Sequence, residues 1–195
     1  MTYFLEKLTT TNFQNLTHIN LSNNKITNLP KNFGTLPCIQ WLDLSYNRLG
    51  IRGQYKWLWI EQFAIQKSLI FLNISYNLLK ELPVYIDKLR TLRELKISHN
   101  MLQRLPKRII NLKNLEILDV SYNWLLYLPP TLFFVNRCLR TLDISMNPFL
   151  STDLHYTVGE YNVIPSLIEL SSNILLNHRF VAVTFIYYFH LRYFY

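Results

Sequence analysis

The chain has 195 residues, half of them hydrophobic, so a single domain with a substantial core fits within its length. Glycine and proline are sparse and no long polar tract occurs, which excludes an intrinsically disordered chain as the main interpretation. The net charge of +8 favours acidic partners; nucleic acid is not expected among them, because no nucleic-acid-binding module or aromatic–basic motif accompanies the charge.

The N-terminal segment, residues 1–15, precedes the first regular pattern, and we expect it to form a cap or a partial repeat. It contains charged residues and lacks the apolar stretch of a secretory signal. The two cysteines, Cys38 and Cys138, are too few for a disulfide framework. We therefore expect a cytoplasmic protein, with the nucleus as the alternative location.

Six segments between residues 16 and 150 share the pattern L-x-x-L-x-L-x-x-N, with aliphatic substitutions. They begin at Leu16, Ile39, Leu69, Leu92, Leu115 and Leu139. Each has a serine two residues before its final asparagine, and these asparagines are Asn24, Asn47, Asn77, Asn100, Asn123 and Asn147. Their spacings of 23, 30, 23, 23 and 24 residues define an internal repeat.

Each repeat has the apolar spacing of a short strand followed by a turn. Two aliphatic residues separated by one residue point to the same side of a strand, and the residue between them points to solvent. Further apolar residues follow the turn, among them Ile86, Leu89, Ile109 and Leu112. One repeat cannot bury these side chains alone, but stacked repeats can, so the pattern predicts a solenoid over residues 16–150.

This pattern resembles the leucine-rich-repeat family over roughly Leu16 to Asn147. Four connections contain Leu-Pro, as in the intracellular, Ras-scaffold-like class of these repeats, and they begin at Leu29, Leu82, Leu105 and Leu128. The resemblance implies an α/β solenoid, a curved right-handed superhelix with a parallel sheet on its concave face. It also implies that each final asparagine is buried and bonds the backbone of adjacent turns. A protein-binding scaffold for intracellular signal transduction follows from the same resemblance.

One interval between asparagines is seven residues longer than the regular repeat, which places an insertion near residues 50–67. The insertion lacks the Leu-Pro signal and contains Tyr55, Trp57, Trp59 and Phe63. We favour a longer helix on the convex side with these aromatic side chains packed on the core, because aromatic residues are most often buried. A protruding insert that binds a partner is the alternative.

Solvent-facing side chains of successive strands are expected to line up, because stacked strands share one register. Trp41 should then lie beside Phe71, and Tyr46 beside Tyr76, and exposed aromatic side chains on a rigid sheet are good anchors for a partner. The predicted concave binding residues are Trp41, Tyr46, Phe71, Tyr76, Lys96, His99, Asp119, Tyr122 and Asp143. For the tyrosines the alternative is a residue preference that is common in the family, in which tyrosine before asparagine packs along the strand edge.

Residues 151–179 depart from the repeat and contain an amphipathic helical pattern, with Ser166 as its N-cap. This pattern resembles the elongin-binding box of cullin-RING substrate receptors, although Ser171 stands where cysteine is usual and no cullin-selecting Leu-Pro segment follows. By that resemblance the elongin-binding residues would be Ser166, Leu167, Leu170, Ser171, Ile174 and Leu175. The alternative is a helix that caps the last repeat.

The aromatic tail, residues 180–195, is shorter than the ~20 residues of a membrane-spanning helix, so no membrane span is expected, and a segment at the membrane interface is the alternative. No phosphate-binding glycine loop and no paired C-x-x-C or H-E-x-x-H motif occurs, and the histidines do not cluster. We therefore expect no enzyme activity, metal, cofactor or small-molecule substrate. The expected function is to bind a protein partner; the alternative is a substrate-recognition subunit of an elongin–cullin–RING ubiquitin ligase, with elongin B–C as a further partner.

Overall fold

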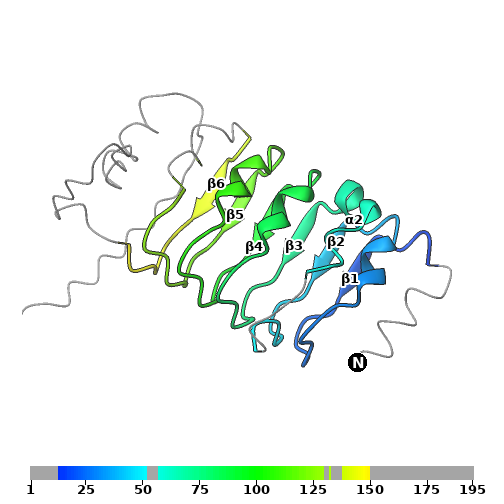
Figure 1. Ribbon diagram of the computed structural model, residues 1–195, viewed down its shortest axis with the longest axis horizontal. Helices are drawn as coiled ribbons and strands as arrows, with labels where there is room; N and C mark the ends of the chain where they lie inside the picture. The colour runs from blue at the N-terminus through cyan, green and yellow to red at the C-terminus, as the bar shows by residue number, and fades with distance from the viewer. Residues whose placement is uncertain (1–12, 52–56, 130–131, 133–137, 150–195) are drawn as a thin grey trace, which may run out of the picture.

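Six short parallel strands form one sheet in which the strands follow one another in chain order (Figure 1). The computed structural model describes residues 13–51, 57–129, 132 and 138–149. The strands are β1 (His18–Asn20), β2 (Trp41–Asp43), β3 (Phe71–Asn73), β4 (Glu94–Lys96), β5 (Ile117–Asp119) and β6 (Thr141–Asp143). Their register aligns the central leucines of neighbouring strands, so the same side chain of each repeat stacks on that of the next.

Short helical segments lie across the core from the sheet (Figure 1). They are the 3-10 helices η1 (Lys31–Thr35), η2 (Val84–Lys88) and η3 (Lys107–Asn111), and the α-helix α2 (Phe63–Ser68). Pro30, Pro83 and Pro106 immediately precede the three 3-10 helices, with φ angles of −64°, −62° and −62°. Proline already has this φ and needs no hydrogen-bond acceptor for a backbone N–H, which explains the recurrent Leu-Pro pair.

A continuous hydrophobic core separates the sheet from the helical side. Leu95 and Ile97 from β4 and its following turn are fully buried, and Leu118 and Val120 hold the same places in the next repeat. The predicted side chains that close the core from the helical side are also fully buried: Ile86, Leu89, Ile109 and Leu112. Each such burial stabilises the fold by about 1.5–3 kcal/mol. The predicted solenoid, a curved α/β architecture with a parallel sheet, is confirmed.

The final asparagines of the repeats form a buried hydrogen-bonded ladder. Asn100 Nδ2 donates to the carbonyl of Ile74 in the preceding repeat at 3.0 Å and to two carbonyls of its own turn. Asn100 Oδ1 accepts the backbone N–H groups of Asn77 and Leu79, each at 3.0 Å. The bond to a carbonyl of the preceding repeat recurs at Asn47, Asn77, Asn123 and Asn147. The predicted role is confirmed for Asn47, Asn77, Asn100 and Asn123, which are buried, and Asn147 makes the same bond while half-buried. For Asn24 the prediction was wrong, because this half-buried residue of the first repeat has no preceding described repeat and donates only to carbonyls of its own turn.

The insertion near residues 50–67 places its two tryptophans in the core. Trp59 is fully buried and contacts the Phe33 ring edge-on, with the ring centroids 6.2 Å apart. Trp57 is also buried, and its ring centroid lies 5.9 Å from that of Trp59. Gly34 lies against the Trp59 carbonyl, where a Cβ atom would not fit. For Trp57 and Trp59, packing on the core was the correct interpretation.

Phe63 departs from that interpretation. It is the first residue of α2, its exposed fraction is 69%, and Lys67 Nζ lies 4.1 Å from the centroid of its ring. The prediction that Phe63 packs on the core was wrong, because α2 buries Ile65, and a residue two positions earlier in a helix faces the opposite way. The fourth aromatic residue, Tyr55, lies outside the described residues.

Candidate functional site

Three aromatic rings lie side by side on the solvent side of β1, β2 and β3. The parallel register makes His18, Trp41 and Phe71 direct neighbours. The rings of Trp41 and Phe71 are stacked, with centroids 4.9 Å apart and an interplanar angle of 6°, and the His18 ring lies 6.1 Å from that of Trp41. The predicted contact between Trp41 and Phe71 is confirmed. Both side chains are half-buried. The solvent side of the sheet, formed by these three residues and the outward residues of β4 to β6, is called the strand face below.

Lys96 places a positive charge beside these rings. Its Nζ lies 5.5 Å from the centroid of the Phe71 ring and 3.0 Å from Oε1 of Glu94. The side chain of Lys96 is 40% exposed, so the ammonium remains accessible to a partner. A cation over an exposed aromatic face contributes about 0.5–1 kcal/mol, which helps to hold Lys96 in this position.

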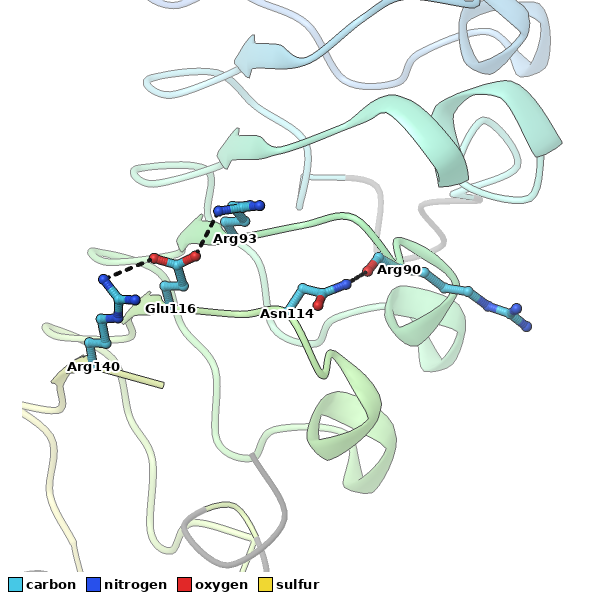
Figure 2. Close-up of polar contacts among 5 residues, drawn as sticks. All are labelled: Arg90, Arg93, Asn114, Glu116 and Arg140. Atoms are coloured by element: carbon cyan, nitrogen blue, oxygen red, sulfur yellow. Dashed lines mark hydrogen bonds and ion pairs between the residues drawn. The ribbon is translucent and has the colours of Figure 1, made fainter. Parts of the chain in front are cut away.

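A charged network borders the strand face. Figure 2 shows Glu116 between Arg93 and Arg140, which come from the neighbouring repeats. Arg93 Nη1 lies 3.0 Å from Glu116 Oε1, and Arg140 Nη1 lies 3.7 Å from Glu116 Oε2. In the same view, Asn114 Nδ2 donates to the carbonyl of Arg90 at 2.6 Å and joins two successive repeats. Exposed ion pairs contribute only about 0–1 kcal/mol, so this network adds little to the stability of the fold.

The carboxylates predicted to contact a partner already have a structural role. Asp119 Oδ1 accepts the backbone N–H of Ser121 at 3.0 Å, and Asp143 Oδ1 accepts that of Ser145 at 2.9 Å. The same bond to the serine two residues later recurs at Asn20, Asp43 and Asn73. Such bonds stabilise the turn after a strand. Asp119 and Asp143 lie on the strand face as predicted, but one oxygen of each carboxylate is committed to the fold.

Lys96 holds the place that asparagine or aspartate occupies in the other five repeats. Because a lysine side chain has no acceptor, it cannot bond the backbone N–H of Ser98. We expect Lys96→Asn to raise the free energy of unfolding by about 0.5–1.5 kcal/mol, the value of one restored hydrogen bond. Urea denaturation measures this change, and Asn20→Ala, which removes the same bond from the first repeat, should have the opposite sign. A Lys96→Asn variant less stable than the wild type would contradict this account of the turn.

A second set of rings, here called the edge column, follows the ends of the strands. Its members are the residues before the ladder asparagines: Tyr46, Tyr76, His99 and Tyr122. Successive rings are stacked with centroids 4.0–4.1 Å apart and interplanar angles of 10–12°. The predicted contact between Tyr46 and Tyr76 is thus confirmed. The hydrogen bond with the Tyr46 side chain raises the pKa of the Tyr76 hydroxyl above its ordinary value.

The backbone of the edge column is strained. All four residues have positive φ angles, between 50° and 56°. This left-handed region costs an ordinary L-residue about 1–2 kcal/mol, whereas asparagine, which is Asn23 at the same place in the first repeat, tolerates it better. Strained backbone persists where the surrounding structure holds it, and it is frequent at binding sites.

The nine predicted concave residues therefore divide between two surfaces. Trp41, Phe71, Lys96, Asp119 and Asp143 belong to the strand face, and the other four form the edge column. The six predicted elongin-binding residues lie outside the described residues: Ser166, Leu167, Leu170, Ser171, Ile174 and Leu175.

Sequence reasoning missed three exposed or partly exposed residues that follow the ladder asparagines, Leu78, Met101 and Trp124. A signal for them exists, because the residue after the asparagine changes from lysine and arginine in the first two repeats to apolar residues in the next three.

The part of the chain that the structure describes contains no group of three His, Cys, Asp or Glu side chains that could hold a metal ion. Within the same residues, no helix has the length and apolar character needed to cross a membrane. Cys38 and Cys138 are not joined by a disulfide.

Known proteins resemble the chain in both sequence and fold. Residues 3–49 and 90–149, more than half of the chain, match the family model described as Leucine rich repeat. A solved structure of a leucine-rich-repeat protein from Leptospira interrogans is 31% identical, with a TM-score of 0.65. The match covers 75% of this chain and 35% of that one, so the chain spans little more than a third of that protein. No curated protein sequence matches the chain.

Proposed function

Because the chain belongs to the leucine-rich-repeat family, we propose that it is a non-catalytic scaffold that binds a protein partner on its strand face. The observation that carries this proposal is the stacked pair of Trp41 and Phe71, which is partly exposed on the solvent side of a rigid sheet. A large apolar patch on an open surface is typical of an interface. Aromatic side chains also supply most of the binding energy in many interfaces, since they bury a large area with few rotatable bonds.

The charges beside this pair favour a partner segment that combines an apolar side chain with an acidic group. The apolar side chain would pack against Trp41 and Phe71, and the acidic group would compete with Glu94 for Lys96, whose Nζ lies 3.0 Å from the Glu94 carboxylate and 5.5 Å from the centroid of the Phe71 ring. The net charge of +8 supports an acidic partner. The Leu-Pro connections are similar to those of the Ras-scaffold-like class, and this similarity supports our proposal of a role in intracellular signalling in the cytoplasm, with the nucleus as the alternative.

Site-specific photo-crosslinking tests the proposed surface. The crosslinking amino acid p-benzoylphenylalanine replaces Phe71 on the strand face or, as a matched control, Tyr85, a half-exposed aromatic residue of η2 on the helical side. We expect the probe at position 71 to capture a protein that the probe at position 85 does not. An excess of wild-type chain without the probe should compete for the partner and prevent the capture, whereas the same excess of the Trp41→Ala chain should not. Equal capture at the two positions would contradict a partner on the strand face.

The alternative function that we propose is substrate recognition in an elongin–cullin–RING ubiquitin ligase. It is supported by the sequence alone, in which Leu167 and Leu175 hold the two apolar positions of the elongin-binding pattern. The test mixes the purified chain with recombinant elongin B–C and repeats the measurement with Leu167→Asp. Binding that this substitution abolishes supports the ligase role. Absence of binding, or binding that survives Leu167→Asp, would contradict the ligase role and leave the scaffold as the proposed function.

A further inference from the structure

The helical side of the solenoid is strongly basic. Residues 30–38, 57–69, 83–92 and 106–115, here called the helical face, contain seven lysines and arginines but only two carboxylates, Glu61 and Asp87. The Asp87 side chain is 14% exposed, and its Oδ2 lies 3.8 Å from Arg108 Nη1. Among the described residues, this is the one ion pair that the seven basic side chains form. The charge of the other six is therefore available to an anionic partner.

Arg90 illustrates the direction in which this charge points. Figure 2 shows its side chain on the side of the helical segments, extending away from Arg93, Glu116 and Arg140, which border the strand face. Its backbone carbonyl accepts the amide of Asn114, but the guanidinium points outward. The helical face is thus a surface separate from the one assigned to the protein partner above.

Exposed apolar side chains accompany the basic residues in two neighbouring helical segments. In α2, Phe63 is mostly exposed, and Lys67 Nζ lies 4.1 Å from the centroid of its ring. In η2, Tyr85 is half-exposed, and Lys88 Nζ lies 4.6 Å from its centroid. Val84, beside Tyr85, is 57% exposed. Each segment therefore presents apolar surface and a cation together, outside the core.

We propose that the helical face binds the surface of an anionic phospholipid bilayer. Aromatic and aliphatic side chains enter the headgroup region, while lysine and arginine side chains keep their charged ends at the level of the phosphates. The negative potential of the bilayer surface attracts each basic residue that lies near it. Basic charge spread over several helical segments suits lipid headgroups, because they move laterally to meet it.

Other anionic partners match these side chains less well. A nucleic acid would use aromatic rings for base stacking, but a lysine already covers one face of Phe63 and of Tyr85. Val84 is aliphatic and offers no surface for stacking. A protein segment rich in Asp and Glu would neutralise the cations but leave Phe63 and Val84 in water. A bilayer accepts both the charge and the apolar surface.

Sedimentation with vesicles tests the proposal. The purified full-length chain is mixed with vesicles of phosphatidylcholine alone, or of equal parts of phosphatidylcholine and phosphatidylserine, and the bound fraction gives the partition coefficient. We expect binding to the anionic vesicles that added salt weakens, because salt screens the attraction between exposed charges. Binding to phosphatidylcholine alone should be at least about tenfold weaker.

A charge-neutralising variant tests the contribution of the basic residues. Lys88→Gln combined with Lys107→Gln should weaken the partition about 25-fold, about fivefold for each charge removed. The matched control is Lys25→Gln combined with Arg48→Gln, which changes the net charge equally. Both control residues are exposed and follow the first two ladder asparagines, outside the helical face. The control should weaken the partition by less than about threefold.

Phe63→Ala tests the apolar contribution. We expect the partition to weaken at least about threefold, because less apolar surface enters the headgroup region. The ratio of wild-type to variant partition should stay constant as salt is raised, since this contribution is not electrostatic. Trp124→Ala is the control: it removes an aromatic side chain that is 58% exposed but lies outside the helical face, so it should leave binding unchanged.

Three results would overturn the proposal. The first is no binding to the anionic vesicles, or equal binding to phosphatidylcholine alone. The second is an equal loss in either variant and its control, which would assign the binding to another part of the chain, such as residues 180–195. The third is wild-type binding by Phe63→Ala, or tighter binding of single-stranded RNA that the double lysine variant loses, since the helical face would then bind polyanions in general. The vesicle assay contains no protein partner, so its outcome is independent of the proposed function.

Discussion

Replacement of Asn100 by alanine is expected to lower the free energy of unfolding by about 3–5 kcal/mol. The variant would deprive the backbone N–H groups of Asn77 and Leu79 of their acceptor. It would also leave three carbonyl groups without the amide that now donates to them. Each buried polar group left without a partner costs about 1–3 kcal/mol. Urea denaturation monitored by circular dichroism measures the change.

Asn24→Ala is the matched control for the ladder. Asn24 is half-buried in the first repeat, and within the described residues its amide bonds only carbonyls of its own turn. We expect Asn24→Ala to cost less than about 1.5 kcal/mol, since water can replace the lost bonds. If both variants lost the same stability, the hydrogen bonds between repeats would not be the source of the effect.

Trp59→Ala is the second substitution with a large expected effect. Trp59 is fully buried beside Phe33, and truncation of a buried aromatic side chain costs about 3–5 kcal/mol because it leaves a cavity. The midpoint of thermal unfolding and the free energy from urea denaturation should both fall. This result would show that Trp59 joins the described part of the insertion to the core.

The insertion itself supplies the control for Trp59→Ala. Phe63, four residues later, is mostly exposed, and Phe63→Ala is expected to change the stability by less than about 0.5 kcal/mol. Equal losses in the two variants would mean that burial does not distinguish these aromatic residues, and the description of the insertion would be wrong.

The repeat pattern predicted the sheet closely because one register governs every strand. When Leu42, Leu72 and Leu95 stack, the side chains beside them must align as well, so the neighbours Trp41 and Phe71 followed directly from the sequence. The ladder asparagines were predictable for the same reason, since a polar residue repeated at a turn needs the same partner in every repeat.

The helical side was harder to predict because its lengths and orientations vary between repeats. The insertion contains four aromatic residues, and the sequence does not say which of them a short helix turns toward the core. Trp59 precedes α2 and packs inward, whereas Phe63 begins α2 and faces solvent. This difference depends on the packing of the segment against η1, which no local spacing reveals.

Two features of the candidate surfaces also needed the structure. The hydrogen bond from Asp119 Oδ1 to Ser121 depends on the local turn, and its sequence signal is the recurrent Asn/Asp-x-Ser triplet. The close stacking of the edge column involves a left-handed backbone at each of its residues, which local sequence does not reveal for tyrosine and histidine. The substitution of lysine for asparagine or aspartate at position 96 became informative only from the structure. In the other five repeats, the side chain at this place accepts a hydrogen bond from the backbone N–H of the serine two residues later.

The most direct test of the central claim is the affinity of the partner captured through position 71, measured by titration calorimetry with the wild type, Trp41→Ala and Tyr85→Ala. An aromatic anchor at the centre of an interface contributes about 2 kcal/mol or more. We therefore predict that Trp41→Ala weakens binding by about 30-fold or more and that Tyr85→Ala leaves it unchanged. Wild-type affinity in Trp41→Ala, or an equal loss in Tyr85→Ala, would contradict the proposal that the strand face binds the partner.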